Sequence, residues 1–425
     1  MDEFAEAILL DVARQHGTPS FVYFAEPIRQ RVIDLQRKFG QHFKISFAVK
    51  SNPNRELLRL LNKTGVELDV SSFGEVMRGL DAGFKAEEIG FSGPAKRQFE
   101  IQNAVEEGIG TFICESLEEV EELNHVCSVR GCTQDYLLRI NPIQIPKLFG
   151  LHMGGRPSQF GIDEEQLANI KPALDRLKSV SLKGFHIFSG GNSLYHEAII
   201  ENVVNSAKLF QEFSKRFDLR PTKLIFGSGF GIPYFEGDEP LSLAVLAQAM
   251  NPIIESMKSD SRFANTCFVL EMGRYLVGSF GYMLTSVVGT KHSRGTDICL
   301  CDAGFNNNLS AAGMMGTVMR RDWRFWNLSK PDATAESDYM LVGPLCASFD
   351  ILGARVTLPE TSKGDVLALA SSGAYGLTAS PTRFISHPEP QEFLVDQAAG
   401  KAIVEDVTES YKHYPPMGNQ KPSIG

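Results

Sequence analysis

The sequence predicts an α/β fold in which a (β/α)8 TIM barrel is followed by a C-terminal, mostly β domain. Eight short apolar strands alternate with amphipathic helical stretches over about 230 residues, which matches such a barrel in order and length. After Gly278 the strands follow one another without long helices between them. We therefore expect a barrel over residues 26–278 and a β-rich domain built from residues 1–25 and 279–425. An open doubly wound sheet is the alternative, but it requires a glycine-rich fingerprint after its first strand, which this sequence lacks.

The barrel strands are predicted from short apolar runs that end in polar or glycine residues. They cover Ile45–Lys50, Val66–Ser71, Glu88–Ser92, Thr111–Glu115, Tyr136–Asn141, Leu182–Ser189, Lys223–Gly227 and Cys267–Glu271. Helices are expected between them near 54–63, 73–82, 97–107, 116–129, 164–178, 195–216 and 240–259. Residues 2–15 also place apolar side chains at helical spacing.

The second domain is predicted from alternating apolar and polar residues. Its strands are expected at 281–289, 297–301, 337–343, 354–358 and 365–371. The short run 21–24 is a candidate N-terminal strand of the same domain. Residues 413–425 contain three prolines and several polar residues, so we expect a frayed tail there.

Composition narrows the class of protein and of partner. A net charge of −9 and an isoelectric point near 5.6 argue against nucleic acid or an anionic membrane as the main partner. The N-terminus is acidic, unlike a signal peptide, and no apolar run could span a bilayer, so we expect a cytoplasmic protein. Seven cysteines without zinc-ligand spacing predict free thiols and no metal site.

Polar residues stand at every predicted strand end, which is where barrels of this kind place their active sites. They are Lys50, Asp69, Ser92, Glu115, Arg139, Asn141, His186, Ser228, Glu271 and Arg274. Lys50 is the most informative, because a lysine at the end of a buried strand is costly unless it is used. Burial should lower its pKa, and a neutral amine can form a Schiff base with an aldehyde. The alternative is a lysine that turns its ammonium outward to solvent.

Two glycine-rich turns favour a phosphate. Gly227-Ser228-Gly229-Phe230-Gly231 and Ser189-Gly190-Gly191-Asn192-Ser193 would let bare backbone N–H groups surround an anion, although each turn alone is a weak signal. Arg274 could add a cation. Glu271 beside a pyridine nitrogen would keep that ring protonated and able to accept electrons; alternatively, it forms a salt bridge with Arg274. Lysine, phosphate cradle and carboxylate together describe a pyridoxal 5′-phosphate site.

Five segments carry a family resemblance. They are Phe47-Ala48-Val49-Lys50-Ser51-Asn52-Pro53, Glu271-Met272-Gly273-Arg274, Cys301-Asp302-Ala303-Gly304, Gly343-Pro344-Leu345-Cys346 and Gly373-Ala374-Tyr375-Gly376. In this order they resemble the alanine-racemase-fold (type III) decarboxylases that depend on pyridoxal phosphate, the superfamily of ornithine and diaminopimelate decarboxylases. The resemblance covers nearly the whole chain. It implies a barrel plus a β domain, and a homodimer with shared active sites.

The resemblance also implies roles for individual residues. Lys50 would hold the cofactor as a Schiff base, Glu271 would pair with the ring nitrogen, and Cys346 of the partner subunit would handle the proton that replaces carbon dioxide. The other cofactor-binding residues implied are Asp69, Glu75, His186, Phe188, Gly190, Gly191, Ser228, Gly229, Gly273, Arg274 and Tyr375, with Gly229, Arg274 and Tyr375 at the phosphate. Arg139, Arg156 and Asp350 are the implied substrate-binding residues. On chemistry alone, Cys346 would more often be an inert thiol.

Two departures from the family pattern bear on the substrate. Phe188 stands where the family usually has a histidine stacked on the cofactor ring, and His186 shares its strand face, either in the site or as a core residue. Ala347 follows Cys346, where diaminopimelate decarboxylases have a glutamate and ornithine decarboxylases an aspartate to hold the distal amine. An unpaired buried ammonium is strongly disfavoured, so a free diamine substrate is doubtful.

The segment Ile143–Phe160 resembles decarboxylases of siderophore and antibiotic pathways and those associated with exosortase systems, as do 230–235 and 376–381. That branch implies a small-molecule conjugate or a carrier-protein-bound amino acid as substrate. Cations that could receive its carboxylates or phosphates are Lys147, His152, Arg156, Arg320, Arg321 and Arg324. The alternative for this segment is a surface excursion without a substrate role.

Other functions remain open at this point. A decarboxylase of a free amino acid, of the diaminopimelate, lysine or ornithine type, is the main alternative. A racemase of the same fold is disfavoured. The resemblance implies an arginine beside the cofactor ring nitrogen in such racemases, whereas this chain has Glu271 there. A catalytically dead regulatory homologue would not need Lys50, Glu271 and Cys346 together.

Overall fold

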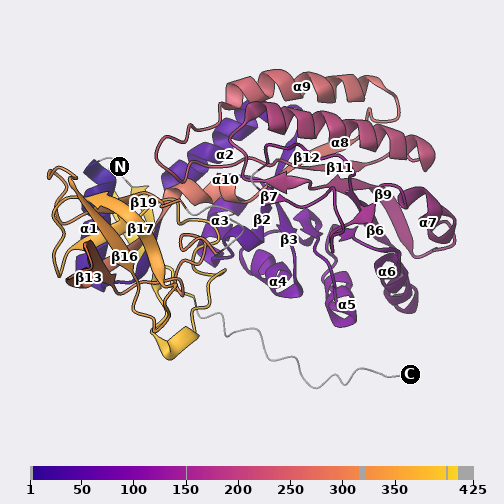
Figure 1. The fold of residues 1–425 in the computed structure, drawn as a ribbon. Coiled ribbons are helices and arrows are strands. Elements are labelled where there is room, and N and C mark those ends of the chain that lie inside the picture. Colours follow the sequence, from indigo (N-terminus) through magenta and orange to yellow (C-terminus); the bar gives the residue numbers. More distant parts are fainter. Residues whose placement is uncertain (1–2, 150, 315–320, 399–400, 410–425) are drawn as a thin grey trace.

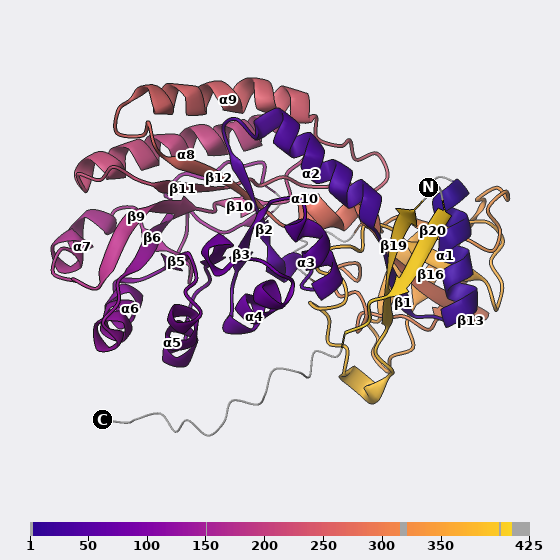
Figure 2. The ribbon, with the colours of Figure 1, turned by 180° about the vertical axis from the view of Figure 1, so that it is seen from behind.

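The computed structural model describes residues 3–149, 151–314, 321–398 and 401–409. A closed barrel of eight parallel strands, ringed by helices, lies beside a mostly β domain that contains the N-terminal helix (Figure 1, and from behind in Figure 2). The predicted fold class is therefore confirmed. The predicted tail at 413–425 and Arg320 lie outside the described residues.

The barrel is built from all eight predicted strands, whose ends differ from the prediction by at most two residues. They are β2 (Lys44–Ala48), β3 (Glu67–Val70), β4 (Ile89–Phe91), β5 (Thr111–Cys114), β6 (Gln134–Asn141), β9 (Val180–Ile187), β11 (Lys223–Gly227) and β12 (Cys267–Met272). Neighbouring strands pair in parallel, and the pairs β5–β6 and β12–β2 close the ring. Since parallel strands end on the same side, their carboxyl ends form one barrel mouth.

Helices cover the outside of the barrel. They are α2 (Ala25–Phe39), α3 (Arg55–Asn62), α4 (Phe73–Asp81), α5 (Gln98–Glu106), α6 (Leu117–Arg130), α7 (Leu167–Leu174), α8 (His196–Arg216) and α9 (Leu243–Ser259), with the short α10 (Arg274–Val277) after β12. Ser72 and Ser116 begin α4 and α6 by accepting the N–H groups of Glu75 and Glu119 with their hydroxyls. The helix α2 was not predicted from the sequence, although its buried Ile28, Val32, Leu35 and Phe39 repeat at helical spacing.

The β domain joins the two ends of the chain. Its elements are α1 (Glu3–His16), β1 (Ser20–Phe24), β13 (Gly281–Ser293), β14 (Thr296–Cys301), β15 (Phe325–Asn327), β16 (Ser337–Val342), β17 (Ile351–Leu358), β18 (Val366–Leu369), β19 (Gln391–Ala398) and β20 (Lys401–Asp406). The main strand order is β17-β16-β14-β13-β1-β19-β20. The candidate N-terminal strand at 21–24 is confirmed, because β1 pairs with β13 and β19. The sequence analysis missed β15, β19 and β20.

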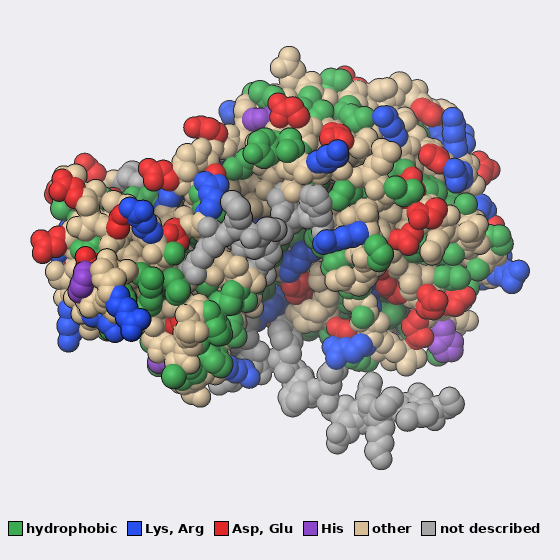
Figure 3. All heavy atoms as spheres, viewed as in Figure 1, with side chains coloured by type: hydrophobic (Ala, Val, Ile, Leu, Met, Phe, Trp, Pro, Cys, Tyr) green, Lys and Arg blue, Asp and Glu red, His purple; other side chains and the backbone are tan. Residues whose placement is uncertain are grey.

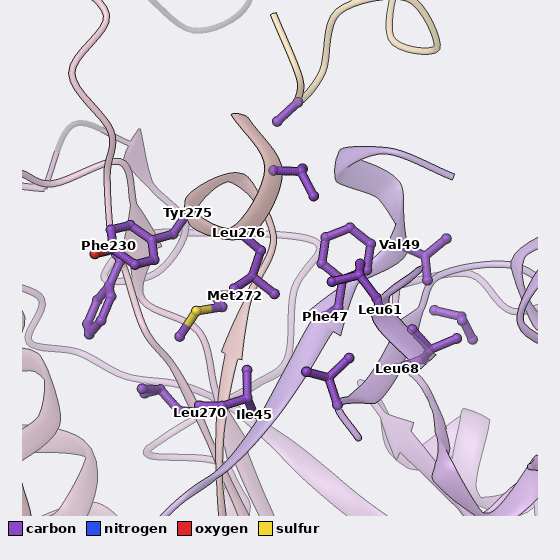
Figure 4. Close-up of a cluster of buried hydrophobic side chains, with 14 of the residues drawn as sticks. Ile45, Phe47, Val49, Leu61, Leu68, Phe230, Leu270, Met272, Tyr275 and Leu276 are labelled. Carbon is purple, nitrogen blue, oxygen red and sulfur yellow. The ribbon is translucent and has the colours of Figure 1, made fainter. Parts of the chain in front are cut away.

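A continuous apolar core supports the barrel mouth. Ile45 and Phe47 of β2 pair in register with Leu270 and Met272 of β12, and all four side chains are buried (Figure 4). The β domain holds the loop that follows β2 from the other side. The Asn52 side chain donates to the carbonyl of Gly373 at 3.0 Å, so the two domains meet at this loop. No helix within the described ranges is long and apolar enough to cross a membrane.

Candidate active site

Lys50 lies in the short 3₁₀ turn Val49–Ser51 directly after β2, and its side chain is exposed at the barrel mouth. Its Nζ atom is 5.8 Å from the ring centroid of Phe188, as expected if both face one site. Desolvation by the protein around the ammonium would by itself lower the pKa of Lys50, but the charges of Asp69 and Glu271 outweigh this desolvation and raise the pKa above its ordinary value. The prediction of a lowered pKa is therefore wrong for the protein without cofactor, where the amine is held as an ammonium.

Glu271 at the end of β12 and His186 on β9 form a buried pair, with 2.8 Å between Oε2 and Nε2. Burial works to raise the pKa of Glu271, but the hydrogen bond with His186 and the charges of Lys50 and Arg139 lower it to about 2. Burial lowers the pKa of His186, so the imidazole is neutral and donates its Nε2–H to the carboxylate. Glu271 therefore pairs with His186, whereas the sequence alternative was a salt bridge with Arg274.

Two further carboxylates stand near Lys50. Asp69 is the next-to-last residue of β3, and burial together with the charge of Glu271 raises its pKa to about 8. Glu75, in the first turn of α4, accepts the N–H of Ser71 at 2.7 Å, and burial raises its pKa. Asp69 Oδ2 and His186 Nδ1 are buried and have no hydrogen-bond partner among the described residues. Such atoms are uncommon in folded proteins and point to a ligand that is bound in the working protein.

The two glycine-rich turns predicted to hold a phosphate lie side by side. The N–H of Ser193 donates to the carbonyl of Gly229 at 3.0 Å, and the N–H of Gly231 donates to the carbonyl of Ser193 at 2.9 Å. Gly229 has a φ of 71°, which favours glycine, and a Cβ at Gly231 would lie 2.8 Å from the carbonyl oxygen of Ser193. The buried Ser228 donates its N–H to the carbonyl of Glu271 at 2.9 Å, so this cradle adjoins the Glu271–His186 pair.

Arg274 begins α10 between two tyrosines. It donates to the hydroxyl of Tyr234, and its Cζ lies 4.8 Å from the ring centroid of Tyr375. Tyr375 is a β-domain residue whose N–H donates to the carbonyl of Ser51 at 2.8 Å. A Cβ at Gly273 would lie 2.9 Å from the side chain of Ser51, so glycine is needed where α10 passes the Lys50 turn. Tyr234 was not predicted as a site residue, because only the fold brings it to Arg274.

The segment 143–160 lies over the glycine turns. Its strand β7 (Leu151–His152) pairs with β10 (Gly190–Gly191), and the N–H of Met153 donates to the carbonyl of Ser189 at 2.9 Å. Phe149 is buried, and a Cβ at Gly229 would lie 2.9 Å from the tip of its ring. This segment is therefore docked on the predicted phosphate cradle, which disagrees with a surface excursion.

The two arginines predicted to bind substrate differ in their surroundings. Arg139 is buried and pairs with the buried Glu115 at 2.9 Å, and its guanidinium lies 4.6 Å from the ring centroid of Phe160. The other carboxylate oxygen of Glu115 accepts the N–H of Gly161 at 2.8 Å. Arg156 is exposed on the segment 143–160. Arg139 thus contacts the end of that segment from the buried side, whereas Arg156 faces solvent.

Cys346 lies outside the barrel, in the turn between β16 and β17, and is exposed. Its neighbour Ala347 packs against the apolar cluster of Phe305 and Leu345. Asp350 ends the turn, buried, with its carboxylate accepting the N–H groups of Phe305 and Leu345 at 2.8 and 2.9 Å. Because Asp350 is engaged within its own turn, the geometry does not support the predicted direct contact with substrate.

Comparison with known proteins identifies the family. Residues 25–278 match the family model described as the pyridoxal binding domain of pyridoxal-dependent decarboxylases. The chain is also 30% identical over 395 residues to the L-glutamyl-(BtrI acyl-carrier protein) decarboxylase of Niallia circulans, covering 92% of this chain and 91% of the relative. This chain belongs to the pyridoxal-dependent decarboxylases.

Two further relatives show the range of this decarboxylase family. The 2-((L-alanin-3-ylcarbamoyl)methyl)-2-hydroxybutanedioate decarboxylase of Staphylococcus aureus is 27% identical and aligns over 91% of this chain and 96% of its own. The crystal structure of diaminopimelate decarboxylase from Helicobacter pylori complexed with L-lysine superposes with a TM-score of 0.82 at 25% identity, over 95% of this chain and 97% of that one. The relatives thus include decarboxylases of conjugates and of a free amino acid.

The residues of this pyridoxal-dependent decarboxylase fit the cofactor that its family uses. A lysine amine, an ionised carboxylate and a backbone cradle meet at one barrel mouth, as pyridoxal 5′-phosphate requires for its aldehyde, its ring nitrogen and its phosphate. Asp69 Oδ2 and His186 Nδ1, which have no hydrogen-bond partner among the described residues, are further polar atoms that could bind this cofactor. The enzyme is a carboxy-lyase that depends on this cofactor.

Proposed function

We propose that this enzyme removes the α-carboxylate of an amino-acid unit carried within a larger conjugate or on a carrier protein, in a specialised pathway of the cytoplasm. The observation that carries the proposal is Ala347, which follows Cys346 where the family resemblance implies a carboxylate in decarboxylases of free diamine acids. Ala347 packs against Phe305 and Leu345, so a distal ammonium placed there would be desolvated without a counter-ion. The domain division at 26–278, with 1–25 and 279–425 in the β domain, is part of the same proposal.

The residues of the barrel mouth divide the work of holding the cofactor. When bound, pyridoxal phosphate supplies a ring that accepts the electron pair released with carbon dioxide. Lys50 would hold its aldehyde group, and Phe188 would contact its ring. Glu271 keeps a proton on the ring nitrogen because its own pKa is about 2, and His186 orients that carboxylate. The phosphate would be held by Gly190, Gly191, Ser228, Gly229, Gly273, Arg274 and Tyr375, and Asp69 and Glu75 would support the lysine.

The proton donor is proposed to come from a second copy of this chain. The turn of Cys346 lies beside an apolar patch formed by Phe349, Phe384 and Ile385, which are 54%, 43% and 46% exposed. The rings of Phe349 and Phe384 both pack on Phe305, with centroid distances of 5.1 and 5.6 Å. Figure 3 shows hydrophobic side chains gathered on this part of the β domain. Such patches are typical of protein contacts, and a homodimer would cover this one while bringing Cys346 to the partner's barrel mouth.

Cations near the barrel mouth support a substrate with additional negative charge. Lys147 and Arg156 are exposed on the segment 143–160. Arg321, half exposed, lies 4.1 Å from the ring centroid of Phe235 and pairs with Asp238 on the loop after β11. Carboxylates or a phosphate on a conjugate or a carrier arm would find partners here. The relatives from Niallia circulans and Staphylococcus aureus act on substrates of this kind by their names.

The test is carbon dioxide release from two groups of substrates. Free ornithine, lysine and diaminopimelate form one group; carrier-bound glutamyl and aspartyl groups and citryl conjugates form the other. A missing charge-assisted hydrogen bond costs about 1.5–3 kcal/mol, so binding of the free diamine acids should be weaker by roughly ten- to a hundredfold. The Ala347→Glu variant should regain part of that loss, and Lys50→Ala is the inactive control.

The opposite pattern would contradict the proposal. If a free diamine acid reacts with kcat/KM of about 10⁴ M⁻¹s⁻¹ or more, and the conjugates do not react, the substrate is a free amino acid. The cofactor assignment would stand in that case, since it depends on the barrel mouth and not on Ala347.

A further inference from the structure

Asp350 closes the turn that carries Cys346. Its carboxylate accepts the N–H of Phe305 through Oδ1 at 2.8 Å and the N–H of Leu345 through Oδ2 at 2.9 Å. Its own N–H donates to the carbonyl of Ala347, and its carbonyl accepts the N–H of Gly343, each at 3.1 Å. Four hydrogen bonds thus join this one residue to both ends of the turn and to the segment after β14.

Two glycines leave no freedom around the Asp350 carboxylate. A Cβ at Gly304 would lie 2.5 Å from Oδ1, and a Cβ at Gly343 would collide with Oδ2 and with the backbone of Gly304. The segment after β14 and the start of the turn therefore pack directly against the carboxylate. Asp350 is only 3% exposed, so these hydrogen bonds are protected from water.

The chemistry of the contact requires a carboxylate. Two N–H donors approach two different oxygens, and an ionised aspartate presents only acceptors. An asparagine of the same shape would turn its NH₂ group towards one of these donors and lose that hydrogen bond. Leu345, one of the two donors, is the residue directly before Cys346, so the lost bond would release the backbone next to the thiol.

We propose that Asp350 is a positioning residue that fixes the Cys346 thiol for proton transfer. The inference rests on the proposed role of Cys346, and it replaces the substrate contact that the sequence analysis assigned to Asp350. Asp350 acts through the backbone of its turn: it touches neither the cofactor nor the substrate. A displacement of a reacting group by about 1 Å can cost about a hundredfold in rate, so a small shift of the turn is enough for a large effect.

The experiment compares Asp350→Asn with Asp365→Asn. Asp365 is also a buried β-domain aspartate, and it accepts from the side chain of Asn327 and the N–H of Ser362, both at 2.9 Å, away from the Cys346 turn. Carbon dioxide release is measured with carrier-bound glutamyl or a citryl conjugate, whichever reacts. Asp350→Asn should lower kcat by about ten- to a hundredfold with KM and cofactor absorbance unchanged, while Asp365→Asn should leave kcat unchanged.

A double-mutant cycle with Cys346→Ala tests the route of the effect. Asp350→Asn should lower kcat only when Cys346 is present. The inference would be overturned if Asp350→Asn lowered kcat equally in the wild-type and Cys346→Ala backgrounds, or if it lowered kcat in neither. Full kcat in Cys346→Ala alone would overturn the proposed role of Cys346 and this inference with it. A loss in Cys346→Ala with none in Asp350→Asn would overturn this inference only.

Thiol alkylation gives a readout that needs no substrate. The rate of reaction of Cys346 with iodoacetamide should change severalfold in Asp350→Asn, while the exposed Cys132 serves as the internal reference. An unchanged rate at Cys346 would overturn the inference. If Asp350→Asn does not fold, Gly304→Ala repeats both measurements, because its methyl group would push on the same carboxylate.

Discussion

The barrel mouth and the Cys346 turn are built in opposite ways. At the barrel mouth, Lys50 follows β2, and His186 and Glu271 lie on β9 and β12. His186 and Glu271 share a hydrogen bond, and the charge of Glu271 acts on Lys50 within the same chain. The Cys346 turn is a single short segment of the other domain, exposed on the outside and held from within by Asp350. The barrel mouth combines residues that are distant in the sequence, whereas the Cys346 turn exposes a single residue to solvent.

The difference indicates a division of labour. The closed ring of parallel strands brings the strand ends to one place, so most of the proposed cofactor ligands lie in the barrel of one subunit. We propose that a second copy of the chain supplies the Cys346 turn to this site. Cofactor binding and proton delivery should therefore be separable by mutation.

Lys50→Ala should have the largest effect. We expect carbon dioxide release to fall by about 10³-fold or more, because the group that holds the cofactor covalently is lost. The yellow absorbance of the bound cofactor should disappear, and borohydride should no longer fix a label. Lys44→Ala is the matched control, since Lys44 lies at the other end of β2 and pairs with Glu67 at 2.9 Å on the surface. Full activity in Lys50→Ala would refute the assignment.

Mixing Lys50→Ala with the impaired Cys346→Ala variant should restore a smaller, defined activity. Lys50→Ala and Cys346→Ala subunits form mixed dimers in which one of two shared sites is intact, so random exchange should recover about a quarter of the wild-type activity. Lys50→Ala mixed with Glu271→Gln is the control, because both changes lie at the barrel mouth and leave no mixed site intact. No recovery after demonstrated subunit exchange would show that each subunit works with its own Cys346 or with none.

The smallest effect is expected for Asp69→Asn. It should change how the stability of the cofactor-free protein depends on pH. The pKa of Asp69 is raised to about 8 in the folded protein, so the fold binds a proton that the unfolded chain releases near its ordinary pKa. Stability should fall as the pH rises from about 4 towards 8, with a slope of at most about 1.4 kcal/mol per pH unit from this group. Asp69→Asn should flatten the melting temperature of the cofactor-free protein between pH 5 and about 8.

The control for this measurement is Asp365→Asn. The hydrogen bonds of Asp365 lower its pKa against the effect of burial, so its contribution to stability is already complete above the ordinary pKa and should not change the slope in this pH range. The pKa of Glu271 is also lowered, to about 2, and does not titrate there. Parallel curves for wild type and Asp69→Asn would contradict the raised pKa.

Much of the barrel could be predicted because its signals are local. The strand Lys223–Gly227 was predicted to the residue, since an apolar run followed by Gly-Ser-Gly marks a strand and its end. The helix α2 and the strands β19 and β20 were missed. β20 has mostly exposed residues and owes its place to pairing with β19, which itself depends on the distant β1. Such long-range pairing leaves little trace in a short window of sequence.

By itself, the sequence determined the alternation of strands and helices and the residue types at the strand ends, because periodicity and turn chemistry are properties of neighbouring residues. It therefore determined which groups reach the barrel mouth. Only the tertiary structure decided how those groups act on one another. Lys50 was expected to have a lowered pKa and has a raised one, because Asp69 and Glu271 arrive from other strands. Charge interactions depend on distances in space, and those distances exist only once the ring of strands has closed.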